Sequence, residues 1–439
     1  MFSSRCSRFI TNFNYVQAKQ QIFSGILRTN SKSTCVARVN IVLKRWLSTQ
    51  LINDGKLIIV RETEGRAVDR REMKFPTVWL RDNCQCSECF HDTTKSRKIN
   101  WERCSNETAI RAAQVTVDSS KNAIIIDWQD AHKSKYDLKW LKQRDFSPEQ
   151  RKKYTEEVYK PKEIIWGKQD YNKILKIYDF HKIITNDSDL YNWLKSLAVY
   201  GVTIIKDAPH DRTVSRQLAD RIGFIKRTTY GEEFEVKSKE NARNYAYLMT
   251  PLPLHIDMPY YEYIAGINIL HCLVQSKSQG GANLLTDGFY VAEQLKQNYP
   301  KYFEILLKTP VDWYDIGKDS GMEFHNIWRE PVINLDTDGR YHRINHNTTK
   351  RDSHFTVPLE VVDLWYEAYD KFLQIAYAST VELKTNPGEV FVFNNRRILH
   401  GRTAYSDSAE NKRHLIGAYV DWDIIYSKMR ILKANLEKV

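Results

Sequence analysis

Apolar and polar residues alternate in short runs along the first third of the chain. Residues 51–79 include the runs KLIIVRE and FPTVWL, and residues 122–128 read NAIIIDW. A period of two places successive side chains on opposite faces of a strand. These runs predict strands, so we expect residues 49–145 to form a small β-rich domain.

The second half of the chain mixes strand-like and helical patterns. Residues 187–198, 213–222, 290–308 and 359–377 have the apolar spacing of amphipathic helices. Strand-like runs lie among them: INILHCLV, PVINL, YHRINHN, VELK, EVFVFN and RHLIGAYVDW. Many short strands with a few covering helices predict a mainly β fold with flanking helices. We expect a double-stranded β-helix (jelly roll) over residues 171–439.

Residues 146–170 separate these two patterns. They include the stretch SPEQRKKYTEEVYKPKEIIWGKQ, which is rich in charge and holds two prolines. Proline and polar clusters between periodic segments mark loops. We therefore expect a linker here, with a helical piece inside it.

Charge changes the interpretation of the amino terminus. The formal net charge of the 439 residues is +12, and residues 1–53 hold eight basic residues and no acid, which leaves +4 on the rest. An acid-free stretch rich in Ser, Thr and Arg is typical of a mitochondrial transit peptide. We expect residues 1–48 to be such a peptide and the protein to reside in the mitochondrial matrix. A disordered basic tail is the alternative.

The same charge distribution bears on partners. The residues after 53 carry a net charge of only +4, which gives little room for a basic face. This disfavours a zinc-dependent nucleic-acid-binding protein. The sequence also holds no run of about 18 uncharged apolar residues, so no membrane span is expected.

Three cysteines, Cys84, Cys86 and Cys89, crowd into one short segment. This spacing suits a metal better than disulfides, above all in a reducing compartment. A structural zinc takes four ligands, and three Cys with one His is a common set. His91 is so close that sharing the ion would strain the loop, and His132 is the better candidate. Free thiols are the alternative.

One His-x-Asp sequence, His255-Ile256-Asp257, occurs among the twelve histidines. A mononuclear Fe(II) site needs two His and one carboxylate on one face, with the other face open. His400 follows the strand-like run EVFVFN, so it could supply the third ligand from a distant strand. A buried structural histidine is the alternative for His400.

Arg413 lies thirteen residues beyond His400. The intervening SDSAEN has turn composition, so residues 396–420 are expected to form a β-hairpin. On the return strand Arg413 and Tyr419 would share one face. A buried Arg there suits a terminal carboxylate, which it can bind with two hydrogen bonds. A surface cation is the alternative.

These motifs together give the chain its family resemblance. It resembles the γ-butyrobetaine dioxygenase and trimethyllysine dioxygenase family over residues 50–435. The matching motifs are WLRDNCQCSEC from Trp79, LHIDMPYY from Leu254, GGANLLTDGF from Gly280, LHGR from Leu399 and RHLIGAYVDWD from Arg413. The resemblance implies a structural zinc, an iron and a 2-oxoglutarate site. Their ligands would be Cys84, Cys86, Cys89 and His132 for zinc, His255, Asp257 and His400 for iron, and Arg413 for 2-oxoglutarate.

The resemblance also implies a small trimethylammonium substrate. Its cation would lie among Tyr230, Phe234, Tyr247 and Tyr419, and its carboxylate near Asn244 and Asn345. Asn347, two residues along the same strand, is an alternative to Asn345. A quaternary ammonium has no N–H, so aromatic faces recognise it through cation–π attraction. Phe234 stands where the butyrobetaine enzymes usually have Trp.

The implied reaction is the hydroxylation of γ-butyrobetaine to L-carnitine, with O₂ consumed and succinate and CO₂ released. Ascorbate is the implied reductant, and a homodimer is the implied assembly. Trimethyllysine is the nearest alternative substrate, and a transit peptide fits that step. The sequences RINHN and GAYVDWDIIYSKMRIL are closer to the butyrobetaine branch.

Overall fold

The chain folds as two compact units, which divide between Asp137 and Leu138. The computed structural model describes residues 45–64, 70–98, 102, 106, 108–120, 122–238, 245–319, 321–406, 408 and 412–438. The expected transit peptide therefore lies outside the described residues as far as residue 44. Residues 45–48 form the first half of strand β1 and pair with β2.

The first unit contains two three-stranded antiparallel sheets, in the orders β1-β2-β3 and β6-β7-β8, and the two-stranded pair β4-β5. Its strands are β1 (Arg45–Ile52), β2 (Leu57–Glu64), β3 (Arg70–Pro76), β4 (Phe90–His91), β5 (Ser96–Arg97), β6 (Ala112–Asp118), β7 (Ala123–Trp128) and β8 (Lys133–Asp137). Strands β2 and β7 bury Ile58, Val60, Ile124 and Ile126, as the alternation predicts. The run FPTVWL is a strand only to Pro76, because helix α1 (Thr77–Asp82) begins directly after it.

The second unit contains two larger sheets, in the orders β11-β22-β13-β20-β10-β9 and β12-β21-β14-β19. Their strands are β9 (Lys176–Asp179), β10 (Val202–Lys206), β11 (Glu233–Lys237), β12 (Leu252–His255), β13 (Ile267–Val274), β14 (Asn283–Asp287), β19 (Val381–Leu383), β20 (Val390–Asn394), β21 (Ile398–Arg402) and β22 (His414–Val420). One apolar cluster takes side chains from both sheets, among them Leu270, Leu285 and Phe391. The sheets therefore pack against each other as in the expected jelly roll.

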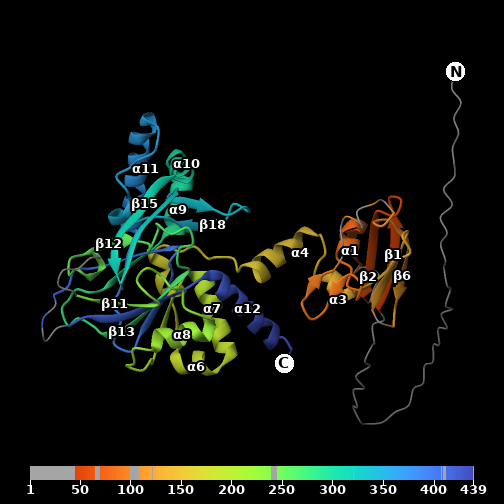
Figure 1. Cartoon of the computed structure of the whole chain (residues 1–439), viewed down its shortest axis with the longest axis horizontal. Helices are drawn as coiled ribbons and strands as arrows, with labels where there is room; N and C mark the ends of the chain where they lie inside the picture. The colour runs from red at the N-terminus through yellow and green to blue at the C-terminus, as the bar shows by residue number, and fades with distance from the viewer. Residues whose placement is uncertain are drawn as a thin grey trace, which may run out of the picture. The chain divides into compact units, whose positions relative to one another are not determined.

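Two groups of helices cover this unit, as Figure 1 shows. Helices α6 (Phe180–Thr185), α7 (Asp187–Tyr200), α8 (Val214–Ile222) and α12 (Trp422–Leu436) form one core cluster with the six-stranded sheet. Helices α9 (Gly288–Asn298), α10 (Pro300–Lys308) and α11 (Leu359–Ala378) form another, with the pairs β15 (Val311–Asp319)–β16 (Met322–Glu330) and β17 (Ile333–Leu335)–β18 (Tyr341–Ile344). The single helix expected over 290–308 is two helices, because Pro300 lacks an N–H and starts a new helix.

The expected hairpin over residues 396–420 is wrong. Strand β21 pairs with β12 and β14, whereas β22 pairs with β11 and β13, so the two strands lie in different sheets. Both strands are buried along nearly their whole length. An isolated two-stranded hairpin could not provide such burial, since each strand needs neighbours at both edges and packing on both faces.

The expected linker over 146–170 has an ordered course. It holds helix α4 (Pro148–Lys153) and one π-helical turn (Tyr154–Tyr159), between helices α3 (Leu138–Lys142) and α5 (Tyr171–Ile174). Ser147 caps α4, because its side chain accepts a hydrogen bond from the Gln150 N–H. Trp166 is 1% exposed and belongs to the core of the second unit.

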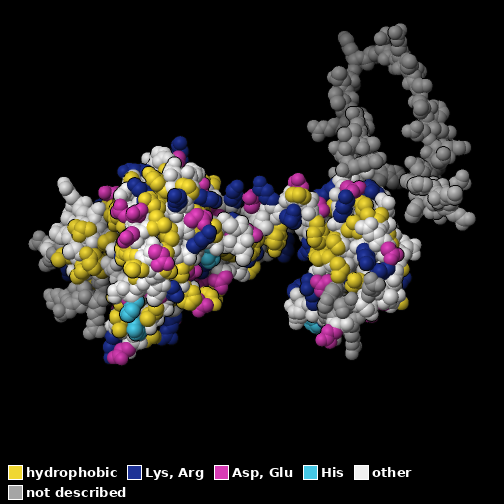
Figure 2. Space-filling model, turned by 90° about the horizontal axis from the view of Figure 1, so that it is seen from above, with side chains coloured by type: hydrophobic (Ala, Val, Ile, Leu, Met, Phe, Trp, Pro, Cys, Tyr) yellow, Lys and Arg dark blue, Asp and Glu magenta, His cyan; other side chains and the backbone are white. Residues whose placement is uncertain are grey.

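Acidic and basic side chains are interspersed over the face that Figure 2 shows. Among the described residues, no helix has both the length and the apolar character that a bilayer crossing requires.

A buried ion pair between Arg397 and Asp287 holds the start of β21, the strand that carries His400, against β14. The Arg397 guanidinium donates two hydrogen bonds to the Asp287 carboxylate, from Nε at 2.9 Å and from Nη2 at 2.7 Å, and both side chains are fully buried. Arg397 also donates to the carbonyls of Val199 and Ile164, while Asp287 accepts from the Trp166 N–H. The pair thus joins the end of α7, the expected linker and the β14–β21 strand pair.

Asp287→Asn keeps the side-chain shape but leaves the buried Arg397 cation without its counter-charge. We expect this variant to lose about 3 kcal/mol or more in the free energy of unfolding of the second unit, measured by urea titration. Glu304→Gln removes an exposed ion pair with Lys308 in α10 and should change the same quantity by less than about 0.5 kcal/mol. If both variants lose the same free energy of unfolding, the buried pair stabilises the second unit no more than an exposed pair does.

Candidate functional site

A cavity in the second unit opens between the two large sheets. It is lined by His255 from β12, His400 from β21, Asn268 and Leu270 from β13, Asn283 from β14 and Tyr419 from β22. Strands from both sheets therefore contribute side chains to one space, as expected for a jelly roll that carries a site inside its barrel.

His255, Asp257 and His400 come together at one side of this cavity. His255 and His400 are direct partners across β12 and β21, and their ring centroids lie 4.2 Å apart. The Nε2 atoms of His255 and His400 lie 3.4 and 3.6 Å from the Asp257 carboxylate oxygens. Three ligand atoms, from β12, from β21 and from the residue two positions after β12, thus lie close together, which fits the two-His, one-carboxylate set of a mononuclear iron site.

The protonation of these groups also suits a divalent metal. His255 Nδ1 lies 2.9 Å from the Pro253 carbonyl oxygen, which can only accept, so Nδ1 is the donor and Nε2 is the ring nitrogen that faces Asp257. Burial alone would raise the pKa of Asp257, but the adjacent His400 and His255 hold it well below its usual range. Burial lowers the pKa of His400, which favours the neutral imidazole.

Two further side chains hold the Asp257 carboxylate. Asn268 Nδ2 donates to Oδ2 at 2.8 Å, and the Tyr419 hydroxyl donates to the same oxygen at 2.9 Å. Sequence reasoning missed Asn268. The available signal was a polar residue in the otherwise apolar start of INILHCLV, where a buried strand would be expected to hold none without a partner.

Arg413, directly before β22, is 3% exposed and lines the same cavity as Leu415 and Tyr419 of that strand. Its Nη2 donates weakly to Asn283 Oδ1 at 3.4 Å, and its Nε has no partner within the part of the chain that the structure describes. Burial, and then the nearby Arg402, lowers the pKa of Arg413 to about 10. A buried guanidinium group that lacks a hydrogen-bond acceptor at Nε is suited to bind the terminal carboxylate of 2-oxoglutarate.

Aromatic side chains form another wall. Tyr230, Phe234, Tyr247 and Tyr419 all line the cavity, and the rings of Phe234 and Tyr419 stack with centroids 4.8 Å apart. Phe234 pairs with Gly417 across β11 and β22, and a β-carbon at Gly417 would lie 2.1 Å from Phe234 Cζ. Glycine is therefore required there for the Phe234 ring to reach the cavity.

Of the asparagines expected near the substrate carboxylate, the structure describes Asn345 and Asn347. Asn345 donates to the Pro331 carbonyl at 3.0 Å and is not among the residues that line the cavity. Asn347, the alternative, does line it. Asn244 lies outside the described residues. Lys350, which sequence reasoning missed, also lines the cavity and pairs with the buried Asp315.

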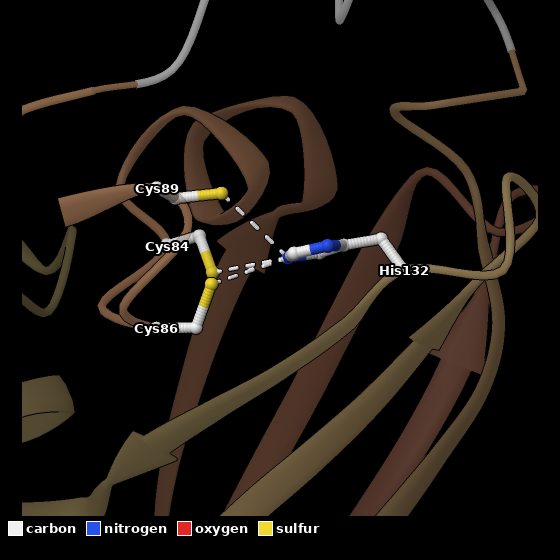
Figure 3. Close-up of side chains that lie close together, drawn as sticks. All are labelled: Cys84, Cys86, Cys89 and His132. Atoms are coloured by element: carbon white, nitrogen blue, oxygen red, sulfur yellow. Dashed lines mark hydrogen bonds between the residues drawn. The ribbon is translucent and has the colours of Figure 1, made fainter.

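The second cluster lies in the first unit and is drawn in Figure 3. The Sγ atoms of Cys84, Cys86 and Cys89 lie 3.4, 3.7 and 3.7 Å from His132 Nε2. Ligands of a tetrahedral zinc at ordinary bond lengths stand about 3.5 Å apart. The hydrogen-bonded turn at Cys86–Phe90 and the β7–β8 turn bring these ligands together, so the loop and the hairpin fit one zinc between them.

The surroundings of the four ligands also fit a cation. The Ser134 hydroxyl donates to Cys84 Sγ at 2.9 Å, and Arg81 donates to Cys89 Sγ at 3.4 Å. Burial raises the pKa of Cys84, and it raises the pKa of Cys89 to about 12. A bound metal would stabilise thiolates at these positions, and the four protein ligands would leave it no open position.

Sequence models of known families match both units. The model described as "Taurine catabolism dioxygenase TauD, TfdA family" matches residues 161–419. The model described as "Gamma-butyrobetaine hydroxylase-like, N-terminal" matches residues 66–142.

Curated proteins match over most of the chain. Human γ-butyrobetaine dioxygenase is 37% identical over 371 residues, which cover 84% of this chain and 94% of that protein. Bovine mitochondrial trimethyllysine dioxygenase is 30% identical over 364 residues, 82% of this chain and 83% of that protein. γ-Butyrobetaine dioxygenase of Pseudomonas sp. (strain AK-1) is 30% identical over 369 residues, 83% of this chain and 92% of that protein.

Solved structures are similar at lower identity. Asparagine oxygenase is 14% identical, with a TM-score of 0.42 over 54% of this chain and 78% of that chain. The non-haem iron oxygenase OrfP with Fe and α-ketoglutaric acid is 13% identical, with a TM-score of 0.41 over 55% of this chain and 83% of that chain. From the family model that covers the second unit and from the curated relatives, the chain belongs to the TauD, TfdA dioxygenase family, in the branch of the γ-butyrobetaine dioxygenases.

Proposed function

We propose that this protein is an Fe(II)- and 2-oxoglutarate-dependent dioxygenase that hydroxylates γ-butyrobetaine to L-carnitine. The observation that carries the proposal is one cavity that combines the His255, Asp257 and His400 cluster with the buried Arg413 and an aromatic wall. The family of the chain and its 37% identity to human γ-butyrobetaine dioxygenase support it.

Bound Fe(II) would supply O₂ activation, in which 2-oxoglutarate loses CO₂ to become succinate and one oxygen atom enters a substrate C–H bond. The side chains of this chain bind and orient the reactants. Arg413 binds the far carboxylate of 2-oxoglutarate with its guanidinium group, whose Nε has no partner among the described residues. Phe234, Tyr247 and Tyr419 receive the trimethylammonium group, and the apolar Leu252, Leu270, Met258 and Leu415 exclude water from the same space.

The charges around the cavity favour γ-butyrobetaine over trimethyllysine. Trimethyllysine carries an α-ammonium, which would need an acidic partner. Among the described residues that line the cavity, Asp257 is the only acid, and its carboxylate is already held by Asn268 and Tyr419. Lys350 also lines the cavity, and its charge is paired with Asp315. A substrate with a carboxylate and no second ammonium fits these charges better.

The remaining features of the proposal concern the setting of the enzyme. Ascorbate would keep the iron reduced, the assembly would be a homodimer, and residues from the amino terminus would direct the protein to the mitochondrial matrix. Residues 45–48 of β1 pair with residues 61–64 of β2. We therefore place the transit-peptide cleavage site before Arg45, so that β1 is kept whole.

The proposed reaction is tested by following succinate formation from 2-oxoglutarate with a panel of trimethylammonium compounds. We expect γ-butyrobetaine to give the highest kcat/KM and L-carnitine as product, and trimethyllysine to be a poorer substrate. His400→Ala removes one iron ligand and should abolish turnover while the zinc content stays unchanged. Near-normal turnover by His400→Ala would refute the iron site, and preference for trimethyllysine would refute the substrate assignment.

For the cysteine cluster we expect about one Zn²⁺ per chain in protein purified without chelators. Cys86→Ser should lose the zinc and lower the thermal stability of the first unit, because the buried Cys84 and Cys89 then lack their cation. Elemental analysis and thermal unfolding measure the two effects. Cys272→Ser, at a buried cysteine of the second unit, is the matched control and should keep its zinc. Zinc-free wild-type protein would contradict the assignment.

Tyr247→Leu tests the aromatic wall, since it keeps apolar bulk and removes the π face. Tyr247 is the cleaner choice, because the Tyr419 hydroxyl also contacts Asp257. We expect the binding of γ-butyrobetaine to weaken by roughly 1–2 kcal/mol, about tenfold, with protein loaded with Fe(II) and 2-oxoglutarate in the absence of O₂.

The control for this variant is a neutral isostere of γ-butyrobetaine in which carbon replaces the quaternary nitrogen. Its binding should differ little between the wild type and Tyr247→Leu. If both ligands lose affinity equally, Tyr247 is a packing residue and not part of a cation site.

A further inference from the structure

The Asp257 carboxylate is held by a pair of residues from the opposite sheet. Asp257 follows β12, whereas Asn268 and Tyr419 are direct partners across β13 and β22. Their side chains donate to the same oxygen, Asp257 Oδ2, at 2.8 and 2.9 Å. Asn268 is 1% exposed and Tyr419 6% exposed, so water does not compete for these bonds.

This arrangement distinguishes the two oxygens of the carboxylate. Oδ2 accepts two hydrogen bonds, which occupy its two lone pairs in the carboxylate plane. Oδ1 faces His255 Nε2 at 3.4 Å, whereas His400 Nε2 lies 3.6 Å from Oδ2. The backbone of Asp257 is fixed as well, because Asn395 accepts from its N–H at 2.7 Å and donates to its carbonyl at 2.9 Å.

Tyr419 serves two partners at once. Its ring stacks on Phe234 with an interplanar angle of 23°, in the wall proposed for the trimethylammonium group. Its hydroxyl, at the far end of the same rigid ring, reaches Asp257. Substrate that packs against the ring therefore touches a residue that also orients a ligand of the metal.

We propose that Tyr419 and Asn268 are positioning residues of the iron site. They hold the Asp257 carboxylate through Oδ2 in the position where it faces His255 and His400, and Tyr419 connects the aromatic wall to that geometry. Hydrogen-bond partners that orient metal ligands commonly change metal affinity 10- to 100-fold when they are removed. This inference rests on the proposed iron site, and it adds two residues to which neither the family resemblance nor the comparisons give this role.

Tyr419→Phe separates the hydroxyl from the ring. We expect its affinity for Fe(II), measured without O₂ by competition with a coloured chelator, to fall about 10- to 100-fold. The affinity for γ-butyrobetaine at saturating metal should change less than threefold, because the ring is kept. Asn268→Ala should lower the Fe(II) affinity in the same way. The visible spectrum of the Co(II)-substituted protein should shift in both variants, which a distant structural change would not cause.

Tyr230→Phe is the matched control. It also removes a cavity tyrosine hydroxyl, but that hydroxyl donates to Asp315 at 2.7 Å, so the Fe(II) affinity should stay within threefold of the wild type. If Tyr419→Phe and Asn268→Ala also stay within threefold, the inference is overturned and the proposed function stands. If the wild type binds Fe(II) no better than His400→Ala, the proposed iron site itself fails.

Discussion

The buried ion pair between Arg397 and Asp287 is the constraint on which the catalytic unit depends. A charge pair with no solvent exposure is stable only when its remaining hydrogen-bonding atoms are also satisfied. Here the backbone of the expected linker and the end of α7 supply those partners. The four-stranded sheet that holds β14 and β21, the end of α7 and the expected linker must therefore be in place together, because the pair is costly in any partly assembled state.

The ion pair also sets the position of the chemistry. Asp287 is opposite Ile398 in the β14–β21 register, and Leu285 is opposite His400. His400 in turn is opposite His255 on β12. A ladder of strand pairing thus runs from the ion pair to the metal-binding side chains, and a one-residue slip would turn His400 away from the cavity. The fully buried pair makes such a slip costly, since either charge would lose its partner.

The sequence could predict the features that depend on local periodicity and on chemical type. It predicted the β-rich first unit, the jelly roll and the clusters around Cys84 and His255, because the alternation of apolar residues and the spacing of metal ligands are visible in the sequence. It could not predict strand partners. The turn-like SDSAEN suggested a hairpin, whereas β21 and β22 lie in different sheets and only tertiary packing decides which strands pair. Asn345 and Asn347 were expected on one strand, but β18 ends at Ile344, before both residues, so strand alternation does not apply to them.

Asn268 shows why the orienting residues of a site are the hardest to recognise from sequence. Metal ligands reveal themselves by type, since few side chains bind iron or zinc. An amide that holds a carboxylate has no such signature, and its role exists only because β13 and β22 bring it beside Tyr419. Tyr419 presents the opposite difficulty, because its ring suffices to explain a place in an aromatic wall. The contact of its hydroxyl with Asp257 joins substrate recognition and metal geometry in one residue, so a substitution there changes both unless the ring is kept.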